Sequence, residues 1–256
     1  MRAPLIIHAG LPRTATTTLQ KTLFPKYCHH PLYTKDRMSS MLAKNEYNLL
    51  DKLNQGQTLA NSEIARIIFT SATLTYGGED EWFSKLLKAT EKLLLKEKSS
   101  ELPPVLSSEG LTLTIASYNI RGSEAGRQFG IIPLVKAVNK LTNKPPMIIL
   151  CLRDPIEHFC SMFLRIVRQG ISKTKDFNKY VKYQVRLENN WKYSSNIAHL
   201  YHQSLVTYLE DLNSIVTPIR YKDLLQSSDA LRLLGLEGEK MALSKLNKEN
   251  HHLSQP

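Results

Sequence analysis

The chain has 256 residues, of which 42% are hydrophobic and 22% charged, as is ordinary for one large globular domain with a sizeable core. Its 34 lysines and arginines against 23 acidic residues leave a net charge of +11, which favours anionic partners unless the lysines only keep the protein soluble. No apolar run reaches about 18 residues, and the three cysteines lack metal-type spacing, so the sequence argues against a membrane span, a disulfide framework and a metal centre.

The sequence predicts a single domain over residues 1–256, because no repeat or linker divides it. Residues 1–4 run directly into the first apolar segment, so we expect no signal peptide. The cysteine usage favours a reducing compartment, and a cytoplasmic protein is expected. The polar tail, residues 244–256, is interpreted as a mobile cap.

Short apolar runs typical of buried parallel strands recur along the chain at residues 5–9, 104–108, 146–152 and 215–219. Between them, apolar residues follow helical spacing within 38–53, 82–94 and 131–141, and residues 55–80 are also predicted to be mostly helical. Strands that alternate with helices predict an α/β fold, a three-layer arrangement in which helices flank a parallel sheet. Ligands of such sheets bind beyond the carboxyl ends of the strands.

The loop after the first predicted strand is the most informative stretch of the sequence. Residues 10–18 read GLPRTATTT and lead into a predicted helix that begins at Leu19. A tight turn at Gly10, the cation Arg13 and the backbone N–H groups of a helix start together form a cradle for an anion. Hydroxyls come from Thr14, Thr16, Thr17 and Thr18. An ordinary N-cap accounts for one of these threonines but less easily for four.

A second motif follows the strand predicted at 146–152. Arg153 and Asp154 precede Pro155, which suits the first turn of a helix. On that helix Ser161, Arg165 and Arg168 fall opposite the apolar face. The pattern is typical of either a second phosphate site or a solvated basic helix face.

Three motifs in order resemble the sulfotransferase family. Residues 10–17 resemble its 5′-phosphosulfate loop, Gly-x-Pro-Lys-Ser/Thr-Gly-Thr-Thr. Arg153 with Ser161 eight residues later resembles its 3′-phosphate site. Residues 220–225, RYKDLL, are similar to its Arg-Tyr-Glu-Asp-Leu-Leu, with Lys222 in place of the Glu.

The resemblance implies a P-loop nucleotide-binding-like α/β fold, the donor 3′-phosphoadenosine 5′-phosphosulfate (PAPS) and the product 3′-phosphoadenosine 5′-phosphate, without a metal. It implies that Arg153 and Ser161 bind the 3′-phosphate, to which helix geometry adds Arg165 one turn further on. The residues expected at the 5′-phosphosulfate are Gly10, Arg13, Thr14, Ala15, Thr16, Thr17 and Thr18.

Two departures from the family pattern bear on catalysis. Arg13 replaces the usual Lys, and a guanidinium can grip an anion with a fork of N–H groups but cannot donate a proton at neutral pH. Its expected role is therefore electrostatic. Ala15 replaces the usual Gly and is strained if that position requires a positive φ.

Sulfuryl transfer needs a group that takes the proton of the acceptor. Glu109 follows a predicted strand and is the carboxylate we expect as catalytic base, unless it only caps the following helix. His29 and His30, expected in a loop after the first helix, are rivals. His8 lies within the first strand and is interpreted as an interior residue whose polar atoms are satisfied.

The acceptor is open: a glycan, phenol, alcohol or lipid fits equally, and nucleic acid is not expected because no nucleic-acid fold is recognised. The resemblance also implies a C-terminal basic loop that closes over the nucleotide, and Lys245, Asn247 and Lys248 lie in the corresponding part of the chain. The aromatic residues that could stack on adenine are Trp82, Trp191 and Tyr193. Oligomeric state is not indicated.

Two other functions compete with sulfuryl transfer. A P-loop nucleotide kinase would need Gly-x-x-x-x-Gly-Lys-Ser/Thr, and residues 10–17 lack its second Gly and its Lys. A non-catalytic basic protein that binds nucleotide or nucleic acid is the other alternative, supported by the departures at Arg13 and Ala15. The 3′-phosphate motif distinguishes the sulfotransferase from a kinase, which would not need it.

Overall fold

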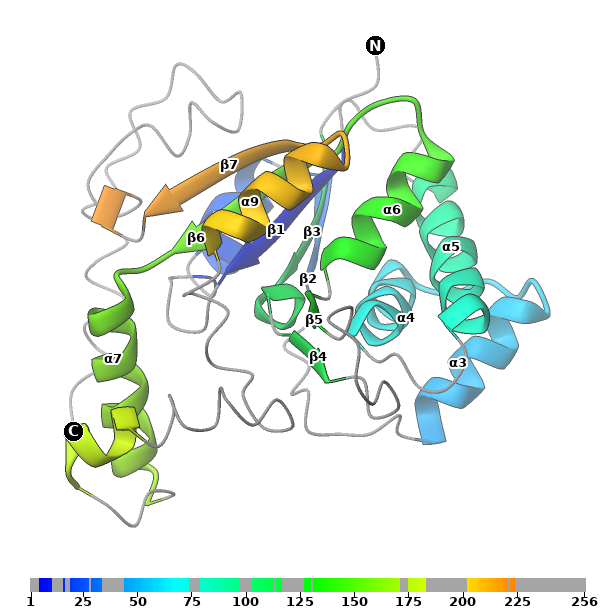
Figure 1. Cartoon of the computed structure of the whole chain (residues 1–256). Coiled ribbons are helices and arrows are strands. Elements are labelled where there is room, and N and C mark those ends of the chain that lie inside the picture. The colour runs from blue at the N-terminus through cyan, green and yellow to red at the C-terminus, as the bar shows by residue number, and fades with distance from the viewer. Residues whose placement is uncertain are drawn as a thin grey trace.

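The main sheet of the protein is parallel, with five strands in the order β2-β3-β1-β6-β7 (Figure 1). The computed structural model describes residues 5–10, 16, 19–27, 29–33, 44–73, 79–96, 103–112, 114–116, 127–129, 131–170, 175–182, 202–220 and 222–223. The strands of the sheet are β1 (Ile6–Gly10), β2 (His29–Tyr33), β3 (Pro104–Ser108), β6 (Met147–Leu152) and β7 (Ile215–Arg220). The predicted α/β class is confirmed.

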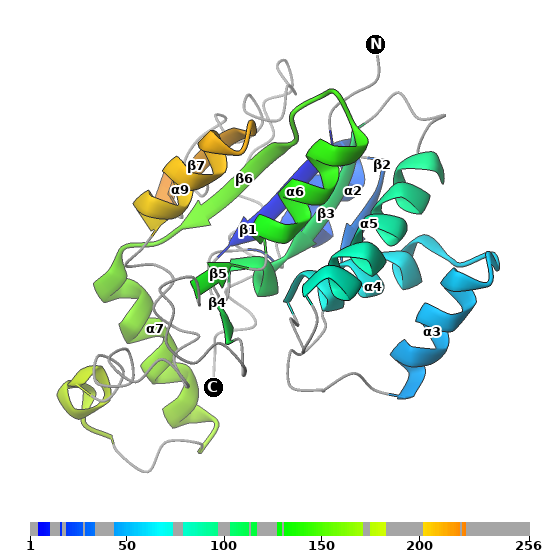
Figure 2. The ribbon, with the colours of Figure 1, turned by 45° about the vertical axis from the view of Figure 1, so that its right-hand side comes forward.

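Helices cover both faces of this sheet (Figure 2). On one face lie η1 (Leu19–Leu23) and α2 (Phe24–Tyr27), and on the other α4 (Asn61–Thr73), α5 (Glu79–Lys96), α6 (Ile131–Leu141) and α9 (His202–Asp211). The remaining elements are α3 (Lys44–Asn54), η3 (Glu109–Thr112), α7 (Pro155–Arg168) and the antiparallel pair β4 (Thr114–Ala116) and β5 (Arg127–Phe129). None of the described helices is long and apolar enough to cross a bilayer.

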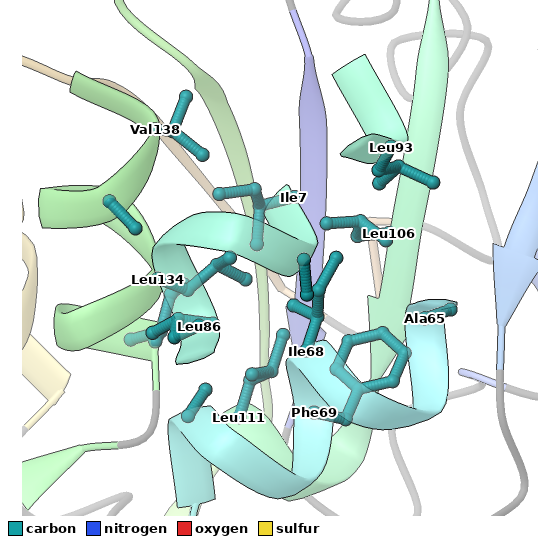
Figure 3. Close-up of a cluster of buried hydrophobic side chains, with 14 of the residues drawn as sticks. Ile7, Ala65, Ile68, Phe69, Leu86, Leu93, Leu106, Leu111, Leu134 and Val138 are labelled. Atoms are coloured by element: carbon teal, nitrogen blue, oxygen red, sulfur yellow. The ribbon is translucent and has the colours of Figure 1, made fainter. Parts of the chain in front are cut away.

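The main hydrophobic core lies between the sheet and the helices α4, α5 and α6 (Figure 3). Ile7 of β1 and Leu106 of β3 are fully buried there, because alternate residues of a strand face the same side. They pack with Ile68, Leu86 and Leu134, one from each of the three helices. Each such side chain contributes about 1.5–3 kcal/mol by leaving water, so this layer holds β1 and β3 in place.

Helix α7 begins immediately after β6 and runs away from the carboxyl edge of the sheet (Figure 2). Oδ1 of Asp154 accepts hydrogen bonds from the N–H groups of Ile156 (2.9 Å) and Glu157 (3.0 Å), and Pro155 fits the first turn. At the other end, Gly170 ends the helix with a φ of +65°, a backbone conformation that glycine adopts without strain. The start of α7 is therefore fixed by a local signal.

Sequence periodicity located most of these elements. The strand predicted at 104–108 and the helix predicted at 131–141 have the observed bounds, and the other three predicted strands differ by a residue at one or both ends. The prediction for 55–80 is correct only in part, because 55–60 are not helical. The expected loop at His29 and His30 is wrong, since both lie in β2. Pro31 is tolerated there because β2 is an edge strand.

Candidate functional site

The site predicted from the sequence lies where the chain changes direction across the sheet. The segment after β1 continues on the face of η1 and α2, whereas the helices α6 and α9 after β3 and β6 lie on the other face. In open α/β sheets, such a switch opens a crevice beyond the carboxyl ends of the strands, where ligands bind. The candidate site is therefore the carboxyl end of β1 with its neighbours.

The strand register brings the separate motifs to this edge. Gly10 pairs with Cys151 of β6, and Ala9 pairs with Ser108 of β3. Glu109 and Arg153 follow those partners by one and two residues, so both motifs end beside the loop that follows Gly10. Adjacent strands lie about 4.8 Å apart, which is close enough for one ligand to contact all three strand ends.

The loop after β1 leaves one described hydroxyl without a partner. Thr16 is 2% exposed, and its Oγ1 has no hydrogen-bond partner among the described residues. A buried hydroxyl left in this way costs about 1–3 kcal/mol, so native proteins rarely keep one without a reason. An anion bound at this strand end would accept that hydrogen bond. The predicted residues Arg13, Thr14, Ala15, Thr17 and Thr18 lie outside the described residues.

A pocket of about 310 Å³ opens along the start of α7. Arg153 and Ser161, the two residues of the second motif, both line it. Arg165, one turn further along, is exposed and does not line the pocket. The other lining residues are Ile156, Glu157, Cys160 and Leu164.

The sequence analysis did not identify Glu157 of this pocket, or its partner Lys222, as site residues. Oε1 of Glu157 lies 2.7 Å from Nζ of Lys222, and Oε2 lies 3.6 Å from Nε of Arg153. The hydrogen bond from Lys222 lowers the pKa of Glu157, and the same bond raises the pKa of Lys222. The four-residue spacing from Arg153 to Glu157 was a signal for one contact, but nothing local predicts the contact with Lys222.

His158 lies on the buried side of the same helical turn. It is 2% exposed, and burial, aided by the positive charge of Arg153, lowers its pKa to about 4. The imidazole therefore stays neutral at physiological pH and adds no charge to the pocket.

A chain of uncharged polar groups lies beneath the site, on the face of η1 and α2. The amide of Gln20 donates hydrogen bonds to the carbonyl (3.2 Å) and to Oγ (2.9 Å) of Ser107. Nδ1 of His8 lies 2.7 Å from that Oγ, and Nε2 lies 3.3 Å from Sγ of Cys151. All groups are satisfied when the Ser107 hydroxyl donates to Nδ1 and the Nε2 proton is donated to sulfur. The prediction that His8 is a satisfied interior residue is confirmed.

The side chains that form this hydrogen-bonded chain are uncharged at neutral pH. Burial lowers the pKa of His8 to about 3 and raises the pKa of the Cys151 thiol to about 12. The ring of Phe24 packs edge-on against the imidazole, with centroids 5.1 Å apart. The polar chain thereby ties the strands β1, β3 and β6 to η1, the helix that follows β1.

The candidate catalytic bases lie in different places. Glu109 is half-buried at the start of η3, directly after β3, so it is at the carboxyl edge of the sheet. Its alternative role, ordering the start of this short helix, stays open because both roles use the same position. His29 pairs with Pro104, the first residue of β3. This register puts His29 and His30 toward the amino edge of the sheet, roughly 13 Å along the strand direction from the carboxyl end of β3. The geometry therefore favours Glu109 over the two histidines.

The structure tests few of the residues that the sequence suggested for stacking on adenine and for the C-terminal cover of the nucleotide. Trp191, Tyr193, Lys245, Asn247 and Lys248 lie outside the described residues, and so does the tail 244–256. Within the described ranges, no group of three or more His, Cys, Asp or Glu residues is arranged to hold a metal ion.

Comparison with known protein families finds no match to this chain, and comparison with curated proteins finds none either. Among solved structures, a sulfotransferase from Alicyclobacillus acidocaldarius aligns with 99% of this chain and 92% of its own, with a TM-score of 0.49 and 13% sequence identity. A likeness this remote does not assign the chain to a family, so the function is argued from the site itself.

Proposed function

We propose that this protein is a sulfotransferase, which transfers a sulfuryl group from PAPS to a hydroxyl or amine acceptor. The observation that carries the proposal is that two motifs far apart in sequence, one at Gly10 and one at Arg153, end side by side at the switch of the sheet. A donor with phosphates at both ends needs two anion sites of this kind. The net charge of +11 agrees with a polyanionic ligand.

The residues present fit such a donor at the loop after β1. Gly10 ends the strand without a side chain, and the buried hydroxyl of Thr16, which has no hydrogen-bond partner within the described part of the chain, has a hydrogen bond to donate. With Arg13, Thr14, Ala15, Thr17 and Thr18, these residues are proposed to hold the 5′-phosphosulfate. Arg13 supplies fixed positive charge where negative charge develops, which is how preorganised donors lower a barrier. The donor supplies the sulfuryl group and leaves as the bisphosphate.

The pocket at the start of α7 is proposed to hold the 3′-phosphate. Arg153 offers a guanidinium, which pairs well with phosphate oxygens, and Ser161 offers a hydroxyl about two turns further on. Arg165 is proposed only as a more distant contribution of positive charge, because it does not line the pocket.

Glu109 is proposed as the catalytic base. Its carboxylate accepts the proton of the acceptor as the new bond to sulfur forms on the side opposite the departing phosphate. The loop around Arg13 and Thr16 stabilises the charge of the transferring group, so catalysis consists of positioning and electrostatics.

Calorimetric titration tests the proposal with 3′-phosphoadenosine 5′-phosphate, adenosine 5′-monophosphate and magnesium–ATP. We expect a preference of at least about tenfold for the bisphosphate, because one added charge-assisted contact is worth about 1.5–3 kcal/mol. Arg153→Ala should abolish this preference. Arg168→Ala removes an exposed arginine at the far end of α7 and should leave it intact.

The titration also separates the competing functions. Preference for magnesium–ATP would establish a nucleotide kinase instead, and failure to bind any of the three would leave a non-catalytic protein. If the bisphosphate binds, radiolabelled PAPS with a panel of phenols, alcohols and glycans reports transfer. Full turnover by Arg13→Ala or by Glu109→Gln would contradict the role assigned to that residue.

A further inference from the structure

The pocket along α7 contains a negative charge where a phosphate is proposed to bind. Glu157 lines the same pocket as Arg153 and Ser161. A carboxylate there repels a phosphate and competes with it for the guanidinium of Arg153. Some other group must offset Glu157 if the pocket is to accept an anion.

The distances show which cation holds Glu157. Nζ of Lys222 lies 2.7 Å from Oε1, a full charge-assisted hydrogen bond. Nε of Arg153 lies 3.6 Å from Oε2, which is beyond hydrogen-bond distance. Lys222 is therefore the principal partner of the carboxylate, and Arg153 is the weaker one.

Lys222 reaches this position through the sheet. Leu152 of β6 pairs with Arg220 of β7, so the chain after β7 leaves the carboxyl edge beside the start of α7. Lys222 and Glu157 thus meet because two neighbouring parallel strands end at the same level.

This ion pair has little to do with holding the fold together. The side chains of Lys222 and Glu157 are 67% and 36% exposed, and exposed ion pairs contribute little to stability because water and salt screen them. Its effect on the local charge is larger. Arg153 and Lys222 balance Asp154 and Glu157 at the start of α7, so loss of Lys222 alone leaves this turn with a net charge of −1.

We propose that Lys222 makes the pocket selective for a phosphate by neutralising Glu157, so that the phosphate rather than the carboxylate becomes the preferred partner of Arg153. This inference rests on the proposed function, because it concerns the site assigned to the 3′-phosphate. Lys222 acts through Glu157 and does not itself contact the ligand, which makes it a specificity-determining positioning residue.

A double-mutant cycle tests this mechanism with 3′-phosphoadenosine 5′-phosphate and adenosine 5′-monophosphate as calorimetric ligands. Lys222→Gln should weaken binding of the bisphosphate roughly fivefold and of the monophosphate less than about twofold, because only the former places a phosphate near Glu157. Glu157→Gln should strengthen bisphosphate binding. In the double variant the affinity should return to within about twofold of the wild type, since the competitor is then absent.

Two controls isolate the position of the charge. Lys222→Arg keeps the cation and should bind the bisphosphate like the wild type. Lys136→Gln removes an exposed lysine from α6 and changes the net charge equally, but it should leave both affinities unchanged.

Each other outcome overturns the inference. A double variant as weak as Lys222→Gln would mean that Lys222 contacts the ligand directly. Equal losses for both ligands, or an equal loss in Lys136→Gln, would indicate a general charge effect. If Arg153→Ala abolishes bisphosphate preference while Lys222→Gln does not change it, only this inference fails; if Arg153→Ala has no effect, the proposed function fails with it.

Discussion

Two polar groups of residues lie at the same end of the sheet and differ in almost every physical respect. The buried chain of Gln20, Ser107, His8 and Cys151 is uncharged and joins three strands to η1, the helix that follows β1. The charged cluster at the start of α7 consists of Arg153, Glu157 and Lys222 and is open to solvent.

The difference shows how one edge of a sheet can combine a stabilising buried network with a proposed anion-binding site. Buried polar groups must be fully hydrogen-bonded and are best kept neutral, because desolvation of a charge is expensive. Exposed charges contribute little to folding but strongly influence which ligand enters. We therefore expect substitutions in the buried chain to change stability, and substitutions in the charged cluster to change binding.

The largest expected effect is that of His8→Ala on the free energy of unfolding. The substitution leaves a cavity beside Phe24 and removes the partner of the Ser107 hydroxyl. Together these should destabilise the protein by about 2–4 kcal/mol, measured by urea unfolding at pH 7.5. A loss of unfolding free energy below about 0.5 kcal/mol would contradict the view that the buried hydrogen-bonded side chains hold the strands together.

The next effect is a dependence of stability on pH. The pKa of His8 is about 3 in the folded protein and near 6.5 when unfolded, so only the unfolded state takes up this proton between those values. The stabilising contribution is complete above pH 6.5 and is lost as the pH falls toward 3, by about 1.4 kcal/mol per pH unit.

Urea unfolding at several pH values measures this slope. His158, whose folded pKa is about 4, acts in the same direction, so the comparison is between the wild type and His8→Gln. The variant should show a slope smaller by about 1 kcal/mol per pH unit in this range. Parallel pH profiles would mean that His8 gains a proton in the folded protein and that the buried chain is not neutral.

The smallest expected effect on stability is that of Lys222→Gln. Both members of the ion pair are exposed, so the urea midpoint should not change measurably, although the bisphosphate is expected to bind more weakly. Raising the salt to about 1 M shortens the Debye length to about 3 Å. This should reduce the difference in bisphosphate affinity between the wild type and Lys222→Gln. A fall in the midpoint comparable to that of His8→Ala would remove the distinction between the two groups.

Local signals made much of this site predictable. The apolar run ending at Gly10, the strand before Glu109 and the N-cap of α7 at Asp154 are each encoded within a few residues. Periodicity also identified α6, since Ile131 and Leu134 recur on one face. These elements needed no knowledge of their partners.

Other features were not predictable from local patterns. The strand at His29–Tyr33 contains a proline and gains its extended conformation by pairing with β3. The pair β4 and β5 was missed because each strand is only three residues long. Neither case carries the alternation or length from which strands are recognised.

Local sequence patterns located four of the five strands of the main sheet and most of the long helices, indicated which of their faces are apolar, and identified the loop residues that offer hydroxyls and positive charge. By contrast, the strand order β2-β3-β1-β6-β7, which brings Gly10, Glu109 and Arg153 to one edge, and the contact of Lys222 with Glu157 there are visible only in the folded structure. The physical reason is that periodicity and capping act over one or two turns, whereas strand pairing and ion pairs depend on residues that are distant in sequence.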